Sequence, residues 1–544
     1  MRRRLFTLGT LATAAVLAAC TGDPLSVTNT NNPSTDALLA SAPGTETLIS
    51  KVIQQMHQGQ YASSDAIQPQ AHILGLESDG AVANFGMLTR STFPRTVIDN
   101  SLNNAVSAGN LRDYSFLTRN VRLAARSLAS LSDFKTAFPT ADYARNRSFA
   151  FFGIGYGIGH LSLIYDSVQV ITAETPNDTL VPFSSYAAAN AVALAMLDSA
   201  IQIALSPDAT SGTGFTIPAA WLSQSNNVSR DQYVQLLRSI KARIRTNVAR
   251  TTAERAAVDW SAAYAEASAG IAADFTLQLG SGRGWTQAWL NQAAVPGGWH
   301  QQPYWIIGMA DTSRAYDTWL GQGLGNKQPF LIQTPDRRFP AGATRAAQQA
   351  VQSPNTPPPG VYFRNRPSGD DTPGFPTGLS WYDNFRYYEI RNNNTVGTWQ
   401  LITRAENDMT AAEALIRLGR VPESLPLINR YRTANNLPSL AGISDTTARV
   451  PGGTACVPRV PTRIVATPTV CGNVWEAMKW EKRMETAFNG YASWYLNGRG
   501  WGDLPRGTPL EWPVPVEETL ARGIAAPYRN TRVAADVGTY AFVP

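Results

Sequence analysis

The spacing of apolar residues along the chain predicts a largely helical N-terminal half. From Thr45, apolar side chains recur at three- and four-residue steps, beginning with Leu48, Val52, Ile53 and Met56. The same spacing predicts helices over about residues 110–132, 143–173, 185–205, 229–250 and 252–275. The connections between them contain Pro, Gly, Asn or Ser, which favour turns.

Two stretches predict antiparallel helix pairs. The helix over 229–250 is joined to its successor near Thr251, and residues 404–435 form a second pair with Gly419 and Pro422 at the turn. Pairs of this length are typical of tetratricopeptide repeats, but the chain shows no clean self-similarity at about 34 residues. Periodicity alone therefore predicts helix pairs and not a repeat.

Residues 473–518 predict an amphipathic helix followed by an irregular closing segment. The apolar stripe of the helix consists of Val474, Met478, Met484, Phe488, Tyr491 and Tyr495. Glycines at 498, 500, 502 and 507 are expected to break the helix. Glu481 falls on the stripe, where a carboxylate is costly unless it is paired. We expect its partner to be Arg483 or an arginine of another helix.

Four glycines alternate with larger residues between Gly153 and Gly159. A dinucleotide-binding loop would need a preceding strand and a different glycine spacing, and the surrounding residues favour a helix. A membrane-type helix contact would need an apolar span of about 20 residues, which Arg145, Arg147 and Asp166 interrupt. Close packing of helices in a soluble core is the favoured interpretation.

The first twenty residues have the three parts of an export signal. Basic residues at positions 2–4 precede an apolar run from Leu5 to Ala19, which is too short to span a membrane, and Cys20 follows Leu17-Ala18-Ala19. This arrangement is typical of a bacterial lipobox, in which Cys20 is acylated; an ordinary secretory peptide with an accidental cysteine is the alternative. Residues 1–19 are then a signal peptide and residues 20–42, rich in Asn, Thr and Ser, a flexible tether.

Charge gives little support to nucleic-acid binding. Removal of residues 1–19 lowers the formal net charge from +6 to +3, and only 16 % of the residues are charged. Lysines are scarce and arginines are scattered, whereas a nucleic-acid site needs a basic patch. Arg243, Arg245 and Arg250 are expected on a solvated helix face.

Cys456 and Cys471 remain after Cys20 is assigned to the lipid anchor. An even pair in an exported chain predicts a disulfide, which would staple the segment leading into the helix at Asn473. A zinc site is the competing interpretation, but the two thiols have no nearby histidine.

Aromatic residues concentrate in the loop-rich middle of the chain, at about 280–400. Aromatic rings on irregular backbone can form platforms for a sugar ring or a peptide side chain, with filling of the core as the alternative. The candidate ligand-binding residues are Trp285, Trp289, Trp299, Tyr304, Trp305, Trp381 and Tyr382.

Catalytic and metal-binding patterns are missing from the sequence. The histidines at 57, 72, 160 and 300 have no metal-ligand spacing, and no G-x-S-x-G motif occurs. We therefore expect no cofactor, no metal and no enzymatic activity. The presence of the paired carboxylates of a glycan hydrolase stays an open alternative, because the sequence does not give the distance between two acidic side chains.

Two blocks near the C-terminus carry a series of short motifs. The first block is Arg404-Ala405-Glu406, Ala412–Gly419, Ile428–Arg432 and Leu437-Pro438. The second is Glu481–Glu485, Gly490, Gly502-Asp503-Leu504 and Pro513-Val514-Pro515 followed by Glu517. By their order and spacing these motifs resemble the SusD/RagB family of nutrient-binding outer-membrane lipoproteins. The resemblance covers residues 401–518 well and the remainder loosely.

The resemblance implies a fold, a location and a partner. The fold would be mainly α: a single domain over residues 43–544 on a tetratricopeptide-like scaffold of helix pairs, with aromatic-rich loops inserted at about 280–400. The protein would be anchored by lipid to the surface of the outer membrane. It would capture an oligosaccharide or peptide and deliver it to a SusC-like TonB-dependent transporter. An exported hydrolase and a surface adhesion protein are the alternatives.

Overall fold

Helices dominate the protein. The computed structural model describes residues 33–80, 83–288, 300–351, 358–367, 380–462, 468–524 and 532–535. In these ranges the α-helices are α2 (Thr35–Leu39), α3 (Ala42–Tyr61), α4 (Ile67–Leu74), α5 (Met87–Ser91), α6 (Ala108–Leu131), α7 (Thr140–Ile164), α8 (Tyr186–Ala204), α9 (Arg230–Asn247), α10 (Thr252–Ala256), α11 (Trp260–Ser268), α13 (Tyr304–Ile307), α14 (Ala315–Gly321), α15 (Arg345–Ala350), α16 (Tyr388–Asn392), α17 (Arg404–Arg417), α18 (Val421–Ala434), α19 (Val474–Glu485), α20 (Ser493–Trp501) and α21 (Val516–Ala521).

The strands are short and pair two by two, each pair antiparallel. The pairs are β1 (Asp79–Gly80) with β7 (His300–Gln301), β2 (Ser167–Gln169) with β3 (Phe183–Ser185), β4 (Thr216–Ile217) with β5 (Val228–Ser229), β6 (Phe275–Leu279) with β10 (Gly397–Ile402), β8 (Phe363–Asn365) with β9 (Tyr382–Asn384), and β11 (Arg459–Val460) with β12 (Val470–Cys471). The β6–β10 ladder is the longest, and it joins the helical N-terminal part to the segment that leads into α17.

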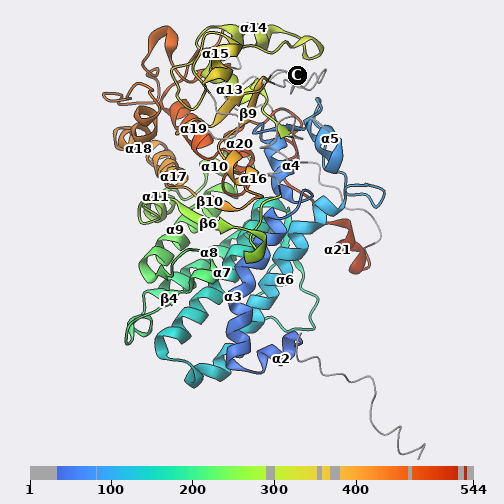
Figure 1. Ribbon diagram of the computed structural model, residues 1–544. Helices are drawn as coiled ribbons and strands as arrows, with labels where there is room; N and C mark the ends of the chain where they lie inside the picture. Colours follow the sequence, from blue (N-terminus) through green and yellow to red (C-terminus); the bar gives the residue numbers. More distant parts are fainter. Residues whose placement is uncertain are drawn as a thin grey trace, which may run out of the picture.

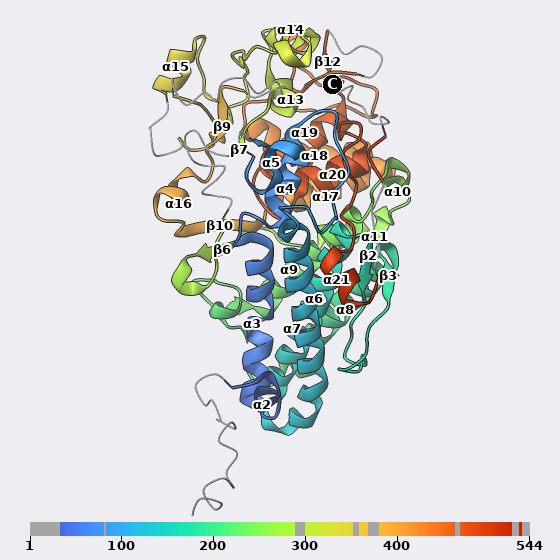
Figure 2. The same ribbon diagram turned by 90° about the vertical axis from the view of Figure 1, so that its right-hand side faces the viewer.

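The molecule has a helical end and a loop-rich end. Figures 1 and 2 show α3, α6 and α7 running side by side below, with α2 at their foot, and α13, α14 and α15 among loops at the opposite end. The C-terminal helices α17, α18, α19 and α20 lie between these two ends (Figures 1 and 2). The mainly α class expected from the sequence is confirmed.

Helix α7 is the centre of the helical end because its glycines admit four neighbours. A Cβ atom added at Gly153, Gly155, Gly157 or Gly159 would stand within 3.0 Å of a side chain of α3, α8, α6 or α9, respectively. Nineteen residues of α7 are buried. The interpretation of this run as close helix packing is therefore confirmed.

Several predicted boundaries shift. The helix expected over 143–173 ends at Ile164 and is followed by β2, and the one expected over 252–275 is divided into α10 and α11. The predicted tether extends too far along the chain, since α2 and the start of α3 lie before residue 43. Arg126 on α6 pairs with Asp36 of α2 at 2.5 Å, which helps to dock this first helix on the body.

The predicted C-terminal helix is broken earlier than expected. α19 ends at Glu485, and positive φ angles at Phe488, Gly490 and Ala492 turn the chain before α20 begins. Gly498 and Gly500 lie inside α20, where a Cβ atom would stand 3.0 Å from Leu504 and from Arg255, respectively. These two glycines therefore serve close packing, and the helix ends at Gly502 in the left-handed conformation (φ +75°).

The two most extensive hydrophobic clusters among the described residues differ in position. The larger extends from α3 through the loop-rich end to α20, and the smaller joins α17, α18 and α19. The predicted disulfide is present in the smaller cluster: Cys456 and Cys471 are bonded, with Cα atoms 5.7 Å apart. It links β12 to the segment before β11, just ahead of α19.

Candidate functional site

An open hollow of about 450 Å³, here called the amide hollow, lies between the start of α9 and β6. Its most frequent side chains are amides, which offer both donors and acceptors. They belong to Gln224, Asn226, Asn227, Gln232, Gln235 and Gln278. Ser225, Thr276 and Phe275 add hydroxyls and an aromatic ring. This composition suits a ligand that is neutral and rich in hydroxyl or amide groups.

Local structure fixes the walls of the amide hollow. Ser229 caps α9 in a capping box with Gln232, and the Gln224 amide donates to the Thr276 carbonyl across the hollow. The Asn227 side chain accepts from the Ala219 amide at 3.0 Å. Among the described residues, the side chains of Asn226 and Gln235 make no hydrogen bond, so both are available to a ligand.

A second hollow of about 330 Å³ shares the segment 272–274 with the amide hollow. Tyr362 and Tyr431 line it, together with arginines that are already engaged by the protein. Arg430 forms an ion pair with Asp408, and Arg386 donates to the Glu485 carbonyl at 2.8 Å. The shared segment makes the two hollows neighbours on one surface.

Four of the predicted ligand-binding aromatics are buried. Trp285, Tyr304, Trp305 and Tyr382 keep 2 % or less of their side-chain surface exposed. They pack on other rings: Trp305 lies 4.7 Å from Trp319 between centroids, and Tyr304 lies 4.1 Å from Phe330. In this structure their rings therefore serve the core, which was the alternative to ligand binding.

Trp381 is placed differently from these four. Its ring is half-buried, and the Arg345 guanidinium lies 4.8 Å from the ring centroid. Trp289 and Trp299 lie outside the described residues. The prediction of an aromatic ligand contact therefore rests on Trp381 within the described chain.

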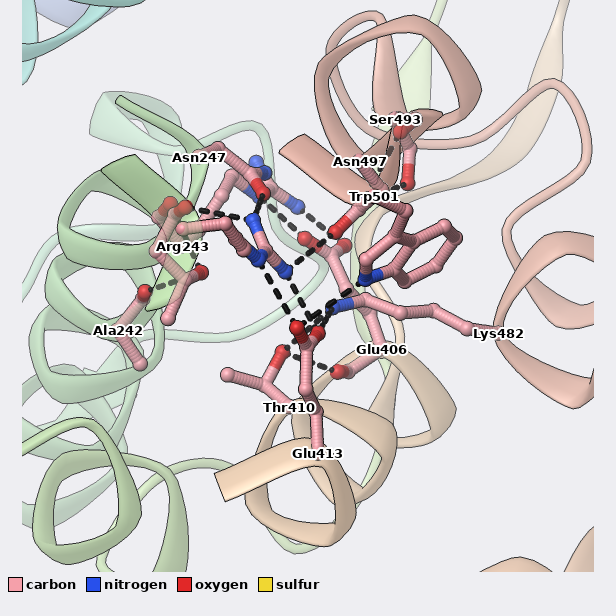
Figure 3. Close-up of polar contacts among 12 residues, drawn as sticks. Ala242, Arg243, Asn247, Glu406, Thr410, Glu413, Lys482, Ser493, Asn497 and Trp501 are labelled. Atoms are coloured by element: carbon pink, nitrogen blue, oxygen red, sulfur yellow. Dashed lines mark hydrogen bonds and ion pairs between the residues drawn. The ribbon is translucent and has the colours of Figure 1, made fainter. Parts of the chain in front are cut away.

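A buried network of charged side chains joins the C-terminal helices to α9 and α10. Arg255 donates to Glu413 through Nε and Nη2, at 2.9 and 2.6 Å, and to Thr246, Asn247 and Asn497 through its remaining N–H groups. Figure 3 shows Lys482 and Trp501 approaching Glu413 from α19 and α20. The network thus connects α9 and α10 with α17, α19 and α20.

Charge compensation sets the ionisation of this network. Burial by itself would raise the pKa of Glu413, but Arg255, Lys482 and Arg417 together lower it well below its ordinary value. Burial lowers the pKa of Lys482 to about 8 despite the attraction of Glu413. The carboxylate is therefore ionised at neutral pH and held by cations on three sides.

Three other arginines contradict the predicted solvated helix face. Arg243 and Arg250 are buried, not solvated: they pair with Glu406 and Glu511. Arg245 is half-buried and pairs with Glu266 at 2.6 Å. The expectation of a solvated face was wrong because the acidic partners come from distant segments.

Glu481 has the arginine partners that its position demanded. Arg338 donates to it at 2.9 Å, and Arg432 on α18 lies 3.5 Å away. Arg483, the other named candidate, instead donates to Asp503 at 2.8 Å. Burial raises the pKa of Glu481 to about 7, against the lowering by the two arginines.

Solved structures of one kind share this arrangement of elements. A SusD superfamily protein from Parabacteroides distasonis matches 90 % of this chain and 99 % of its own, with a TM-score of 0.57 and 9 % identity. One from Bacteroides vulgatus matches 89 % and 98 %, with a TM-score of 0.55 and 12 % identity. A SusD-like carbohydrate binding protein from Bacteroides fragilis matches 93 % and 96 %, with a TM-score of 0.52 and 13 % identity. The chain has the SusD fold. No family model matches the sequence, and no curated protein does.

The residues that carry the sequence resemblance to SusD proteins have a structural role here. Glu406, Glu413, Glu481, Lys482 and Asp503 all belong to buried ion pairs. Glu406 and Glu413 hold α17 against α9 and α10, and none of the five lines the amide hollow. Other residues of the motif blocks line the second hollow, among them Arg404, Arg430, Tyr431 and Glu485. The five buried charged residues therefore support the SusD scaffold, and the motif blocks leave the ligand unspecified.

The amide hollow was missed by the sequence analysis. Its walls come from residues 224–235 and 271–278, which only the fold brings together. A local signal did exist, because Gln224-Ser225-Asn226-Asn227 is a run of polar, amide-bearing residues between two strands. Such a run is equally typical of an ordinary surface turn.

Proposed function

We propose that this protein is a cell-surface lipoprotein that captures a polar nutrient for a SusC-like TonB-dependent transporter. The amide hollow carries the proposal: it is open, lined mainly by neutral donors and acceptors, and built on the SusD fold. Amide and hydroxyl groups suit the hydroxyls of an oligosaccharide, with a peptide as the second class. The similarity in fold to a SusD-like carbohydrate binding protein from Bacteroides fragilis favours the oligosaccharide.

Attachment and delivery complete the proposal. Acylated Cys20 would hold the body at the outer membrane, and the transporter would receive the captured ligand. Hydrolysis is the alternative activity, but a glycosidase needs two carboxyl groups across its cleft. Asp274 is the one acidic residue among the described residues that line the amide hollow. This lining favours binding over turnover.

Titration of the purified protein with neutral oligosaccharides and peptides, followed by product analysis, tests the proposal. We expect saturable binding of an uncleaved ligand, and a loss of about tenfold in affinity in Asn226→Ala/Gln235→Ala, because two ligand hydrogen bonds are removed. Gln202→Ala, an exposed amide on α8, is the matched control.

Other outcomes would revise the proposal in defined ways. Unchanged binding in the double variant with a loss in Trp381→Ala would move the site to the aromatic residue. Cleaved product would favour the hydrolase, and the absence of binding to any probe would contradict a capture function.

A further inference from the structure

A separate hollow of about 190 Å³ contains two arginines and is here called the arginine hollow. It lies beside α5 and the segment 95–106, and it shares no lining residue with the amide hollow. Arg90 and Arg95 line it, with the hydroxyls of Thr89 and Thr96 and the side chains of Asp99 and Asn104.

Arg95 has most of its hydrogen-bonding capacity unused. The residue is 7 % exposed, and its Nε and Nη1 atoms are buried without a hydrogen-bond partner. Its one hydrogen bond among the described residues runs from Nη2 to the Ile73 carbonyl at 3.5 Å, which is long. Within the same ranges no carboxylate lies within ion-pair distance of Arg95. A buried guanidinium normally has such a partner.

The surrounding residues hold both arginines in place. The Arg95 guanidinium carbon lies 4.4 Å from the Phe93 ring centroid, and Phe93 rests on Trp305 at 5.6 Å. Arg90 donates to the Phe85 carbonyl at 3.2 Å and leaves its Nε unpartnered. A Cβ atom at Gly86 would collide with Nη1 of Arg90, so this glycine makes room for the guanidinium.

The charges of the arginine hollow fit a single negative charge. Burial lowers the pKa of Arg90 and of Arg95 to about 10, so both are protonated at neutral pH. Asp99 contributes one negative charge at the rim, and Asp79 acts on Arg95 from a distance. The lining residues alone therefore sum to one positive charge. A guanidinium fork matches the two oxygens of a carboxylate.

We propose that the arginine hollow binds a carboxylate group of an acidic ligand. The carboxylate would accept from the unpartnered Nη1 atom of Arg95 and from Arg90. Two sources share this chemistry: the uronic acid of an acidic oligosaccharide and the acidic side chain of a peptide. The proposal goes beyond capture of a neutral ligand in the amide hollow and stands without it.

Calorimetric titration of the full-length protein in detergent, at low salt, separates these sources. The probes are trigalacturonate, its uncharged methyl ester, triglutamate and triglutamine. We expect at least one acidic probe to bind saturably, with its neutral counterpart about tenfold weaker or more, since a charge-assisted bond is lost. Binding of trigalacturonate alone assigns the sugar source, and binding of triglutamate alone the peptide source.

Variants place the binding at the arginine hollow. Arg95→Gln should lower the affinity for the acidic probe by about tenfold or more. Arg90→Gln serves the same purpose if Arg95→Gln does not fold. Arg119→Gln, an exposed arginine on α6, removes the same charge and should change nothing. Equal binding of acidic and neutral probes, or an equal loss in Arg119→Gln, overturns the proposal. Variants of the amide hollow leave this test unaffected, so the two proposals fail independently.

Discussion

Arg255 and Arg95 are both buried, but the two regions differ in the number of hydrogen-bond acceptors that surround the guanidinium. In the C-terminal network all five N–H groups of Arg255 have acceptors, two of them on Glu413. Beside α5, Arg95 makes one long hydrogen bond within the described residues, and there its Nε and Nη1 have no partner. A fully compensated charge is part of the scaffold, whereas an uncompensated one is poised for an outside partner.

The same contrast holds for buried acids. Glu413 is ringed by cations, and its pKa is well below the ordinary value. Glu77, close to α5 in sequence, accepts one backbone bond from Phe488 and lies 3.7 Å from His72. Burial lowers the pKa of His72 well below its usual value, so the imidazole supplies no charge at neutral pH. Around residues 72–77 burial therefore keeps both Glu77 and His72 largely uncharged at neutral pH, whereas the network around Glu413 pairs its charges.

Breaking the network should have the largest effect. Glu413→Ala leaves Arg255 buried without its carboxylate, and we expect the free energy of unfolding to fall by about 3–5 kcal/mol. Urea denaturation followed by circular dichroism measures the change. Glu423→Ala removes an exposed partner of Arg420 and is the control, for which we expect no measurable change. Equal effects in the two variants would contradict the assigned role of the network.

Glu77 should make stability depend on pH. Burial raises its pKa to about 8, so the folded state holds a proton that the unfolded state, with a pKa near 4.5, releases. The stabilisation is fully present below about pH 4.5 and is lost as the pH rises through 8, at up to about 1.4 kcal/mol per pH unit. Glu77→Gln should remove this contribution, measured by denaturation at pH 5, 6, 7 and 8. A slope identical to that of the unmodified protein would show that Glu77 is not protonated in the fold.

Arg95→Gln should have the smallest effect on stability, and of opposite sign to Glu413→Ala. It removes a buried cation that has no close carboxylate in the part of the chain that the structure describes, so we expect the free energy of unfolding to stay equal or rise by about 1 kcal/mol or less. Thermal denaturation without ligand measures it. A large decrease in the free energy of unfolding would mean that Arg95 already has a compensating partner. Arg95 and Arg255 would then not differ in charge compensation.

The sequence predicted elements better than it predicted contacts. Apolar spacing placed the helices around residues 110–132, 185–205 and 404–435 within a few positions, because that spacing reports which face of each helix is buried. It failed at residues 486–492, where apolar residues continue the stripe although positive φ angles at Phe488 and Ala492 turn the chain. Side-chain spacing does not record a backbone turn that tertiary packing imposes.

The residues of the candidate site were harder to predict than the helices. Trp305 and Tyr304 have the composition of a ligand platform, but their position in the fold buries them. Asn226 and Gln235, by contrast, carry no distinctive motif and yet line the amide hollow. The exposure of a residue depends on which segments pack over it. A local sequence pattern gives no information about segments that lie far along the chain.

The sequence by itself determined the helical class, the disulfide pair and the need for a partner at Glu481, since each follows from local spacing, cysteine count or the penalty for burying a charge. Tertiary structure alone decided which partner each charge received. Glu413 met Arg255 across 158 positions of chain, while no carboxylate of the described ranges lies within ion-pair distance of Arg95. The reason is physical: a hydrogen bond acts over about 3 Å, and only the folded chain sets distances on that scale.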